Sequence, residues 1–361
     1  MKSNKITYIQ FGFLLFSYLS GFSTLFLNEV KLLKQDVWIA YLLGTVIAVS
    51  MIRLMCYIQK QYPSLKMVEI FDKLVGSKLA KLFICIYLLY ILEIQGAACR
   101  ALSFFYTTVV LPSLPSNQII LFIVLCTTYA TFLGLSTIVR SSQVILPFFI
   151  MGIGIICFFI LREMDTNPLL PQFQHGLSEV IYGGWLSFYF PFGKSIVFCF
   201  ILYRVKNLDR IFTSSLCALV LSFFYLLLAS YLTLGALGID LAGTIMFPFF
   251  SVIQMVKFGE YLERIEIMII GIWTIFTLFE IVVLQHIFIK LIAHMLHLKN
   301  SRNFILPVGL LFFAVSQNSF IRLSDLSIYN TTIAPVSSLL PTAIIPILFV
   351  FLTWMRKRKP Q

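Results

Sequence analysis

The stretch from Ile6 to Leu27, ITYIQFGFLLFSYLSGFSTLFL, decides how this chain folds. It is apolar over about 20 residues, the length of helix that crosses a hydrocarbon core of about 30 Å. Within it, Ser20-Gly21-Phe22-Ser23-Thr24 introduces a glycine and three hydroxyl side chains at mid-span. The stretch therefore predicts a membrane-spanning helix, uncleaved at its start, that is interrupted at membrane depth.

The composition extends this interpretation to the whole chain. Of its 361 residues, 60% are hydrophobic and only 12% are charged, against about 25% charged in a soluble domain. Nine further apolar segments are long enough to be considered as spans: Val37–Ile58, Leu82–Val109, Gln118–Leu135, Gln143–Leu161, Tyr182–Tyr203, Ile211–Leu237, Tyr261–Leu296, Phe304–Ser316 and Thr332–Met355. We predict a single integral domain, an all-α membrane protein of about ten transmembrane helices.

Two further helices are expected outside the spans. In the connection after Ile58, apolar residues recur at helical spacing (Leu65, Val68, Phe71, Leu74, Val75) among five lysines. This pattern is typical of an amphipathic helix that lies on the membrane surface. The segment 239–259 is broken by Pro248, so we expect a short helix that lies over one face of the bundle.

The positive charges indicate the orientation of the chain. The net charge of +12 could suggest nucleic acid, but Lys and Arg gather in short connections and at the C-terminus. With the N-terminus inside, most of them fall on the inner side, as the positive-inside rule requires. We therefore predict that both termini are cytoplasmic and that the charge reflects topology, not nucleic-acid binding.

A second interruption corresponds to the first. The span Tyr182–Tyr203 contains Phe190-Pro191-Phe192-Gly193, in which proline cannot donate to the helix and glycine makes unwinding easier. Unwound backbone at membrane depth is tolerated where it is buried or lines a cavity, and its free N–H groups attract anions. Two breaks in matching halves indicate a transporter-type ligand site, although either alone is commonly a packing kink. The candidate ligand-binding residues are Ser20, Gly21, Phe22, Ser23, Thr24, Glu93, Phe190, Pro191, Phe192 and Gly193.

Ionisable residues inside the spans are the next candidates, because a charge that faces lipid is costly. Glu93 and Arg100 lie seven residues apart on one face of a helix, Lys194 follows the second break, and Glu280 is midway along its span. Each could contact a ligand, relay a proton or form a structural ion pair. We assign Arg100, Lys194 and Glu280 to coupling or gating.

Catalytic and metal-binding patterns are not evident. The sequence has none of the serine-hydrolase, zinc-protease or nucleotide-binding motifs, so we expect no enzymatic activity and no cofactor. His286, His294 and His297 share one helix end, but no thiolate or carboxylate partner is apparent from the sequence, and a bilayer-interface role is the simpler interpretation. The seven cysteines lack CxxC spacing and are read as small apolar residues.

The order of elements resembles the five-plus-five inverted repeat of the amino acid/polyamine/organocation superfamily. The run from Phe247-Pro248 through Lys257, Gly259 and Glu263-Arg264-Ile265-Glu266 to Ile272-Trp273 resembles the B-subunits of spore germination receptors (GerAB-like). Arg100 followed by Leu111-Pro112 and Pro115 is also similar to that family. The similarity covers essentially the whole chain.

This resemblance implies two repeats, at about 6–161 and 182–355, with broken first and sixth helices. It implies a protein of the spore inner membrane that acts with an A-subunit and a lipoprotein C-subunit and binds a small germinant, such as an amino acid, between the first, third, sixth and eighth helices. Glu263, Arg264, Glu266 and Trp273 are then candidates for partner contact or structural support.

Two alternatives remain open at this point: a proton-coupled amino acid permease, and a germinant-gated channel or scaffold. Some proton-coupled relatives carry a lysine in the fifth helix, whereas Gln143–Leu161 has none. That difference puts coupling by this route in doubt and fits a receptor that need not pump. Function depends on the site, so the fold alone does not choose between these roles.

Overall fold

Helices form nearly all of the structure, a computed structural model that describes residues 5–255, 266–298 and 300–358. The described residues form no β-strand; an isolated bridge joins Ile6 to Val205. The first half of the chain contains α1 (Tyr8–Ser20), α2 (Ser23–Phe26), α3 (Asn28–Leu33), α4 (Val37–Gln61), α5 (Met67–Val75), α6 (Ser77–Phe105), α7 (Ser116–Leu133) and α8 (Leu135–Glu163).

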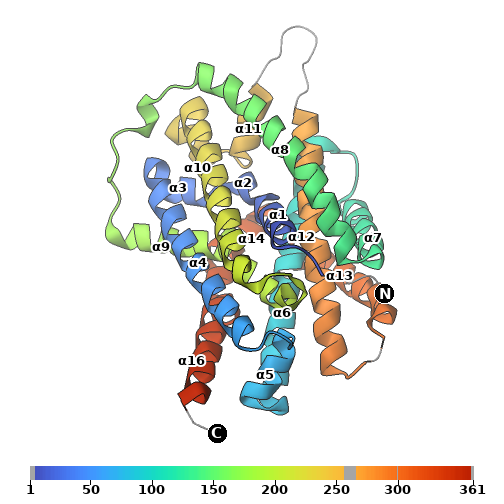
Figure 1. Cartoon of the computed structure of the whole chain (residues 1–361). Helices are drawn as coiled ribbons and strands as arrows, with labels where there is room; N and C mark the ends of the chain where they lie inside the picture. The colour runs from blue at the N-terminus through green and yellow to red at the C-terminus, as the bar shows by residue number, and fades with distance from the viewer. Residues whose placement is uncertain (1–4, 256–265, 299, 359–361) are drawn as a thin grey trace.

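The second half begins with a broken span, in which α9 (Leu177–Ser187) and the 3₁₀ helix η5 (Gly193–Arg204) flank the segment η4 (Phe188–Phe192). It continues with α10 (Ile211–Thr244), α11 (Pro248–Met255), α12 (Glu266–Met295), α13 (Ile305–Ser319), α14 (Leu323–Ile328), α15 (Ala334–Ser337) and α16 (Ile345–Arg358). Figure 1 shows these helices as one bundle, with α1 and α12 near its centre.

The spans confirm the predicted fold class. Eight described segments are long and apolar enough to cross a membrane, and a ninth arises if Ser301–Ser319 and Leu323–Ser337, bent by 100°, count as one. The remaining apolar segment, Leu340–Arg356, is shorter. The last predicted helix, Thr332–Met355, is thus not one continuous helix. Pro335 and Pro341 lack backbone N–H donors, and the chain forms wide helical turns near both.

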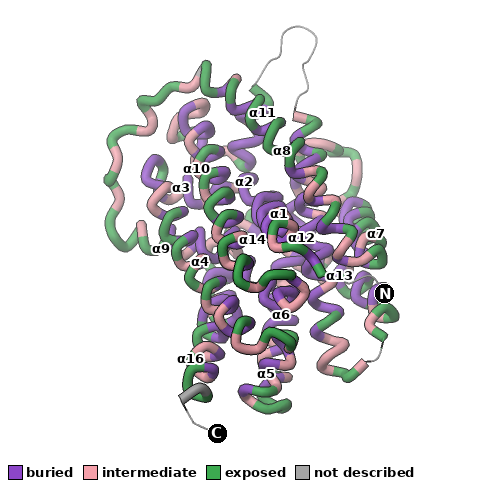
Figure 2. Tube along the Cα trace, viewed as in Figure 1, coloured by how far each residue is buried: buried purple, intermediate pink, exposed green. Residues whose placement is uncertain are grey.

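Burial separates the two broken spans from the others. In the apolar 18-residue window of each span, the buried share is 72% for Tyr8–Phe26 and 89% for Leu177–Arg204. For the other six spans this share is 39–61%. α1 packs against α8, α10 and α12, and η5 packs against α4, α5 and α12. Figure 2 shows α1 buried in the middle of the bundle. The interruptions are thus covered by protein, as exposed backbone inside a membrane requires.

Two expectations about local structure were wrong. The predicted fifth helix begins at Leu135, not at Gln143, because the preceding Gly134 adopts a φ of +88° and turns the chain within one residue. α5 forms as predicted, but its apolar face does not lie on a membrane surface: it is buried against the protein, where Phe71 stacks on Phe349 with ring centroids 4.0 Å apart.

Both chain ends lie at the end of the bundle that holds α5. The Ile6 N–H donates to the Arg204 carbonyl at 3.0 Å, and the Arg356 guanidinium donates to the Leu74 carbonyl at the end of α5 at 3.2 Å. α11 lies at the opposite end (Figure 1), as the short covering helix predicted around Pro248.

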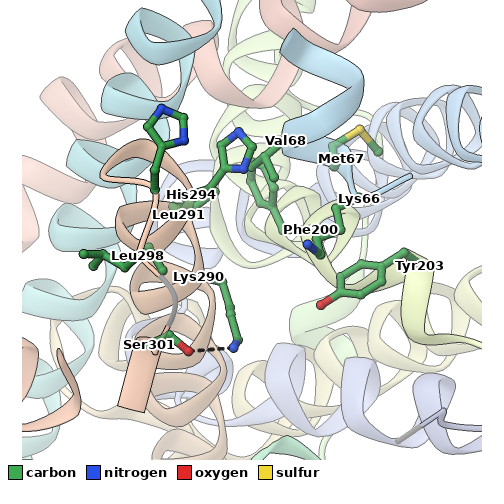
Figure 3. A pocket seen from close by; sticks show the side chains of 12 residues that line it. Lys66, Met67, Val68, Phe200, Tyr203, Lys290, Leu291, His294, Leu298 and Ser301 are labelled. Atoms are coloured by element: carbon green, nitrogen blue, oxygen red, sulfur yellow. Dashed lines mark hydrogen bonds between the residues drawn. The ribbon is translucent and has the colours of Figure 1, made fainter. Parts of the chain in front are cut away.

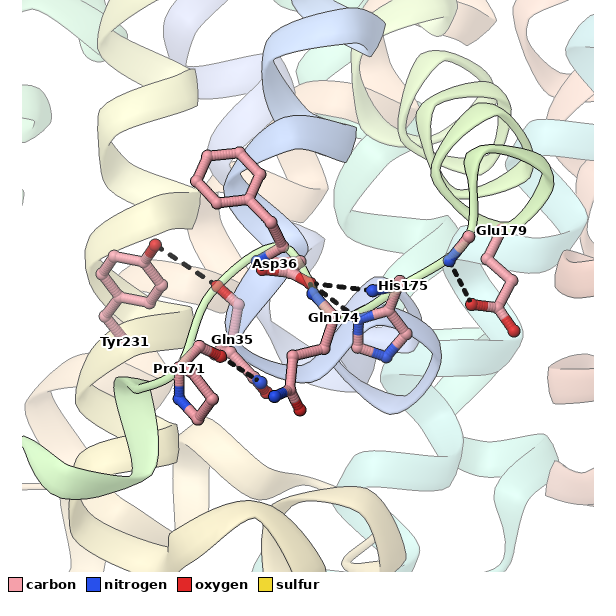
Figure 4. A network of polar contacts seen from close by, with 9 residues as sticks. Gln35, Asp36, Pro171, Gln174, His175, Glu179 and Tyr231 are labelled. Carbon is pink, nitrogen blue, oxygen red and sulfur yellow. Dashed lines mark hydrogen bonds and ion pairs between the residues drawn. The ribbon is translucent and has the colours of Figure 1, made fainter.

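At the end opposite α5, one carboxylate holds the connection between α8 and α9. The fully buried Asp36 accepts from the backbone N–H groups of Phe173, at 2.6 Å, and Gln174, at 2.8 Å, and pairs with His175 Nδ1 at 2.8 Å. Figure 4 shows this network beside the Gln35 amide, which donates to the Pro171 carbonyl at 2.7 Å. The connection between α8 and α9 is therefore anchored by the buried Asp36 carboxylate.

Candidate functional site

The break in the first span is formed at Gly21 and Phe22. α1 ends at Ser20, Gly21 adopts φ −54° and ψ −104°, and α2 begins at Ser23. A Cβ at Gly21 would lie 3.1 Å from Thr277 Oγ1 and 3.3 Å from its backbone nitrogen, so glycine permits α12 to approach the break. The buried Ser20 and Ser23 hydroxyls have no hydrogen-bond partner among the described residues.

The break in the second span is formed around Pro191. Phe190 is extended, with φ −137° and ψ 125°, between helical residues on either side. A Cβ at Gly193 would lie 2.5 Å from the Phe188 carbonyl oxygen, so this turn can close only around a glycine. A Cβ at Gly44 of α4 would lie 2.7 Å from the Phe188 nitrogen, so a second glycine lets α4 pack against the break.

A buried ion pair joins the second break to α12. The Lys194 ammonium lies 2.7 Å from Glu280 Oε2, and the two side chains are only 2% and 3% exposed. The same ammonium lies over the rings of Phe190 and Tyr18, at 4.7 and 5.1 Å from their centroids. The other carboxylate oxygen, Glu280 Oε1, has no hydrogen-bond partner among the described residues.

A cavity of about 40 Å³ lies between these elements. Its walls come from α6 and from both broken spans, together with α12 and Asn330 near the C-terminus. The residues that line it are Phe22, Phe26, Tyr90, Ile94, Ala97, Ala98, Ala101, Tyr189, Phe190, Lys194, Thr277, Glu280 and Asn330. The Tyr90 hydroxyl is buried and, like Glu280 Oε1, unpartnered among the described residues. The space corresponds to a few water molecules at about 10–15 Å³ each.

The predicted site residues divide between this cavity and its supports. Phe22, Phe190, Lys194 and Glu280 line the cavity. Seven others are buried around the two breaks without lining it: Ser20, Gly21, Ser23, Thr24, Pro191, Phe192 and Gly193. Thr24 also shares a hydrogen bond of 3.1 Å with the Tyr225 hydroxyl.

The charges of α6 lie elsewhere and do not pair with each other. Glu93 accepts from the Ser337 hydroxyl at 2.6 Å, outside the cavity lining. Arg100 donates to the Phe320 carbonyl at 2.6 Å and to the Ser116 hydroxyl at 2.9 Å. Arg100 thereby links α6 to the start of α7 and the end of α13. These contacts indicate a structural role for Arg100.

The remaining predicted residues have other surroundings. Trp273 is fully buried and donates to the Tyr225 hydroxyl at 3.0 Å, within an aromatic cluster that includes Phe22 and Phe105. Glu263 and Arg264 lie outside the described residues, and Glu266 begins α12. His294 bonds Asp72 at 2.7 Å, a carboxylate partner that the sequence did not suggest.

Several lining residues were missed by the sequence interpretation. Tyr90, Tyr189 and Thr277 are ordinary residues of apolar helices, and their positions depend on how the helices pack. One signal was available: Gly96-Ala97-Ala98, with Ala101 a turn later, gives α6 a narrow face. Small residues allow close packing or leave space between helices, and here all three alanines line the cavity.

Comparison with known proteins adds the following findings. A family model described as spore germination protein matches residues 5–320. Spore germination protein KB of Bacillus subtilis (strain 168) is 23% identical over 94% of this chain and 92% of its own length. From the same organism, the spore germination protein YndE is 24% identical over 75% of this chain and 76% of its own length.

Two solved structures share the fold. MhsT, in a crystal structure with L-phenylalanine, superposes with a TM-score of 0.65 and 14% identity over 95% of this chain and 97% of its own. Mhp1, a nucleobase-cation-symport-1 family transporter in a closed conformation, gives a TM-score of 0.65 and 13% identity over 99% of this chain and 82% of its own. At these identities the likeness shows the fold alone.

Proposed function

The chain belongs to the spore germination protein family, whose model matches residues 5–320, and on that premise we propose that it is the B-subunit of a nutrient germinant receptor. In this proposal it lies in the spore inner membrane with both termini in the cytoplasm, acts with an A-subunit and a lipoprotein C-subunit, and binds a small amino acid. Binding in the cavity between the broken spans then triggers germination.

The observation that carries the proposal is the unsatisfied polarity of that cavity. Glu280 and Tyr90 both line it, and neither Glu280 Oε1 nor the Tyr90 hydroxyl has a hydrogen-bond partner among the described residues. A buried polar atom without a partner costs about 1–3 kcal/mol, and more if it is charged. A ligand that brings an ammonium group supplies donors to both atoms and removes this cost.

Lys194 complements the other end of such a ligand. Its ammonium is buried in the cavity wall with Glu280 as its carboxylate partner. A zwitterionic amino acid places its carboxylate on Lys194 and its ammonium on Glu280, so one buried ion pair is exchanged for two. A hydrocarbon offers no donor to Glu280 Oε1, and a neutral sugar offers hydroxyl donors but no charge to pair with Lys194 or Glu280.

The size of the cavity couples binding to a change of shape. At about 40 Å³ the space admits waters but not an amino acid, so the Phe22 and Phe190 side chains that line it must move to admit the ligand. Both residues sit at the breaks of their spans. A ligand therefore favours the enlarged state, and this difference in affinity between two states is what a receptor requires.

A proton-coupled amino acid permease is the second candidate, because the fold is shared with the transporters MhsT and Mhp1. Lys194 and Glu280 would then carry the coupling. The absence of lysine from α8 does not favour this role. We prefer the receptor because it needs only a population shift and no passage through the membrane.

The site is tested by binding of labelled amino acids to the purified full-length protein in detergent. The variants are Lys194→Met and Glu280→Gln, and the control is Lys78→Gln, an exposed lysine at the start of α6. We expect saturable binding of at least one amino acid, weakened about tenfold or more in both variants because each removes one charge-assisted contact. Native-like binding by both variants would refute the site.

A further inference from the structure

Two cavities adjoin at the end of the bundle that holds α5 and both chain ends. One, of about 320 Å³, lies between the start of α5, the end of η5 and the end of α12, and includes Lys66, Tyr203 and Lys290 in its lining. The other, of about 300 Å³, includes Arg204, Lys290 and Arg302. They share Lys290 and Ser301 in their walls, and we call the two adjoining cavities together the basic recess.

The recess gathers positive charge from four separate segments. Lys66 precedes α5, Arg204 ends η5, Lys290 lies on α12, and Arg302 lies in the turn before α13. Figure 3 shows Lys66, Tyr203 and Lys290 around one opening, with the Lys290 ammonium directed at the Ser301 hydroxyl 2.8 Å away. Lys66, Arg204 and Arg302 all lie within electrostatic range of Lys290.

Only part of this charge is compensated. Lys66 pairs with Glu69 at 2.8 Å, and His294 is bonded to Asp72. Burial raises the pKa of the Glu69 carboxyl, but hydrogen bonds from Lys66 outweigh that effect and hold the pKa below its ordinary value, so this pair is charged. Among the described residues, no carboxylate lies within ion-pair distance of Arg204, Lys290 or Arg302.

The orientation of the chain in the membrane does not require that positive side chains from four segments line one recess. The positive-inside rule is satisfied by cations anywhere in the loops on one side of the membrane. Cations that line one recess instead repel each other, and a bound anion relieves that repulsion. Two guanidinium groups also offer N–H donors that match the oxygens of a phosphate group. The Arg204 Nε–H donates to the Tyr203 hydroxyl at 3.2 Å, which leaves the terminal N–H groups of Arg204 for a ligand.

We propose that the basic recess binds a phosphate group through Arg204, Lys290 and Arg302. A basic pocket between membrane helices at the cytoplasmic side is suited to the headgroup of an anionic lipid, and the same chemistry accepts a free phosphate. The proposal is independent of germinant binding, since the recess shares no lining residue with the cavity between the broken spans.

The test has two arms, both with the full-length protein. In the first, inorganic phosphate is titrated against chloride at equal ionic strength, and the thermal unfolding midpoint is recorded. In the second, the protein is placed in nanodiscs of phosphatidylcholine with or without phosphatidylglycerol, and retained lipid is counted by native mass spectrometry. A signal in the first arm alone identifies free phosphate as the source, and retention of phosphatidylglycerol identifies the lipid.

The variants make the outcome specific. Lys290→Gln with Arg302→Gln should weaken binding in the responsive arm about tenfold or more, whereas Lys290→Arg should retain it. The charge-matched control is Lys78→Gln with Lys206→Gln, two exposed lysines that line neither cavity. No response in either arm, or an equal loss in the control, would overturn the proposal.

Discussion

Lys194 and Glu280 hold the second break against α12 through a single buried contact of 2.7 Å. Removing two charges from water is costly, and the attraction between them in the interior only partly repays that cost. A buried pair is thus weak evidence for stability in itself. Its position in a cavity wall, with one carboxylate oxygen unpartnered among the described residues, favours a role in ligand binding.

Variants of Lys194 and Glu280 separate a structural role of the ion pair from a role in ligand binding. Glu280→Gln leaves the Lys194 ammonium buried and unpaired, so we expect a loss of about 3–5 kcal/mol of stability and a lower thermal unfolding midpoint in detergent. The double variant Lys194→Met with Glu280→Leu should regain most of the midpoint, because apolar residues of similar volume suit a buried site. It should still bind no amino acid. Native-like binding by the double variant would make the pair purely structural.

Gly21 gives a second prediction at this scale. A side chain there would press on Thr277 of α12, whose Oγ1 and backbone nitrogen lie 3.1 and 3.3 Å from the Cβ position. We expect Gly21→Leu to abolish amino acid binding while the protein still inserts into the membrane. The matched control is Gly154→Leu on α8, where a Cβ would meet nothing within 4 Å. Membrane fractionation and ligand binding are measured on both, and wild-type binding by Gly21→Leu would contradict the assignment.

Single residues were partly predictable from the sequence. Lys194 and Glu280 are conspicuous because charges are rare in apolar spans, and both line the cavity. Arg100 gave the same signal, yet it bonds a backbone carbonyl and a serine. The difference arises from the neighbours that packing supplies, and a sequence pattern does not contain those neighbours.

Helix boundaries and interruptions were easier to predict than site contacts where glycine or proline determines the backbone conformation. The interruptions follow from Gly21 and from Pro191 with Gly193, and the structure places both where expected. The apolar stripe of α5 predicted a helix but not its partner, because a membrane surface and a protein surface both cover such a face. Here the partner is protein: Phe71 contacts Tyr87, Phe200 and Phe349.

This packing predicts that α5 supports the bundle. Phe71→Ala should cost about 3–5 kcal/mol, because it leaves a cavity where an almost fully buried ring now packs on three others. Phe122→Ala on α7, where the ring is 60% exposed, should cost little. Thermal unfolding of both variants in detergent measures the difference. Equal midpoints would mean that α5 is not docked as described.

Asp36 gives the corresponding prediction for the connection between α8 and α9. Asp36→Ala removes the acceptor for three backbone N–H groups and for His175, so the segment 166–176 should open. Limited proteolysis should cut this segment faster in the variant than in the wild type. Asp240→Ala, in the last turns of α10, is the control. Unchanged cleavage would show that other contacts anchor the connection.

At the scale of the whole molecule, the broken spans are the most buried spans and the intact ones surround them. The apolar spans and their two interruptions were predictable because apolar length and Gly/Pro breaks are local properties of the sequence, whereas the five-plus-five order was an implication of the family resemblance. The arrangement of the cavity was not, since α6, α12 and Asn330 meet the breaks only through tertiary packing. The boundaries of the two repeats, at about 6–161 and 182–355, stay a prediction.

The measurement that tests the central claim most directly compares binding with uptake in liposomes that contain the purified protein, under an imposed proton gradient and with a panel of labelled amino acids. The receptor account predicts saturable binding of at least one amino acid, lost in the Lys194→Met with Glu280→Leu variant, and no accumulation inside the liposomes. Accumulation that depends on the gradient would contradict the account and identify the protein as a permease.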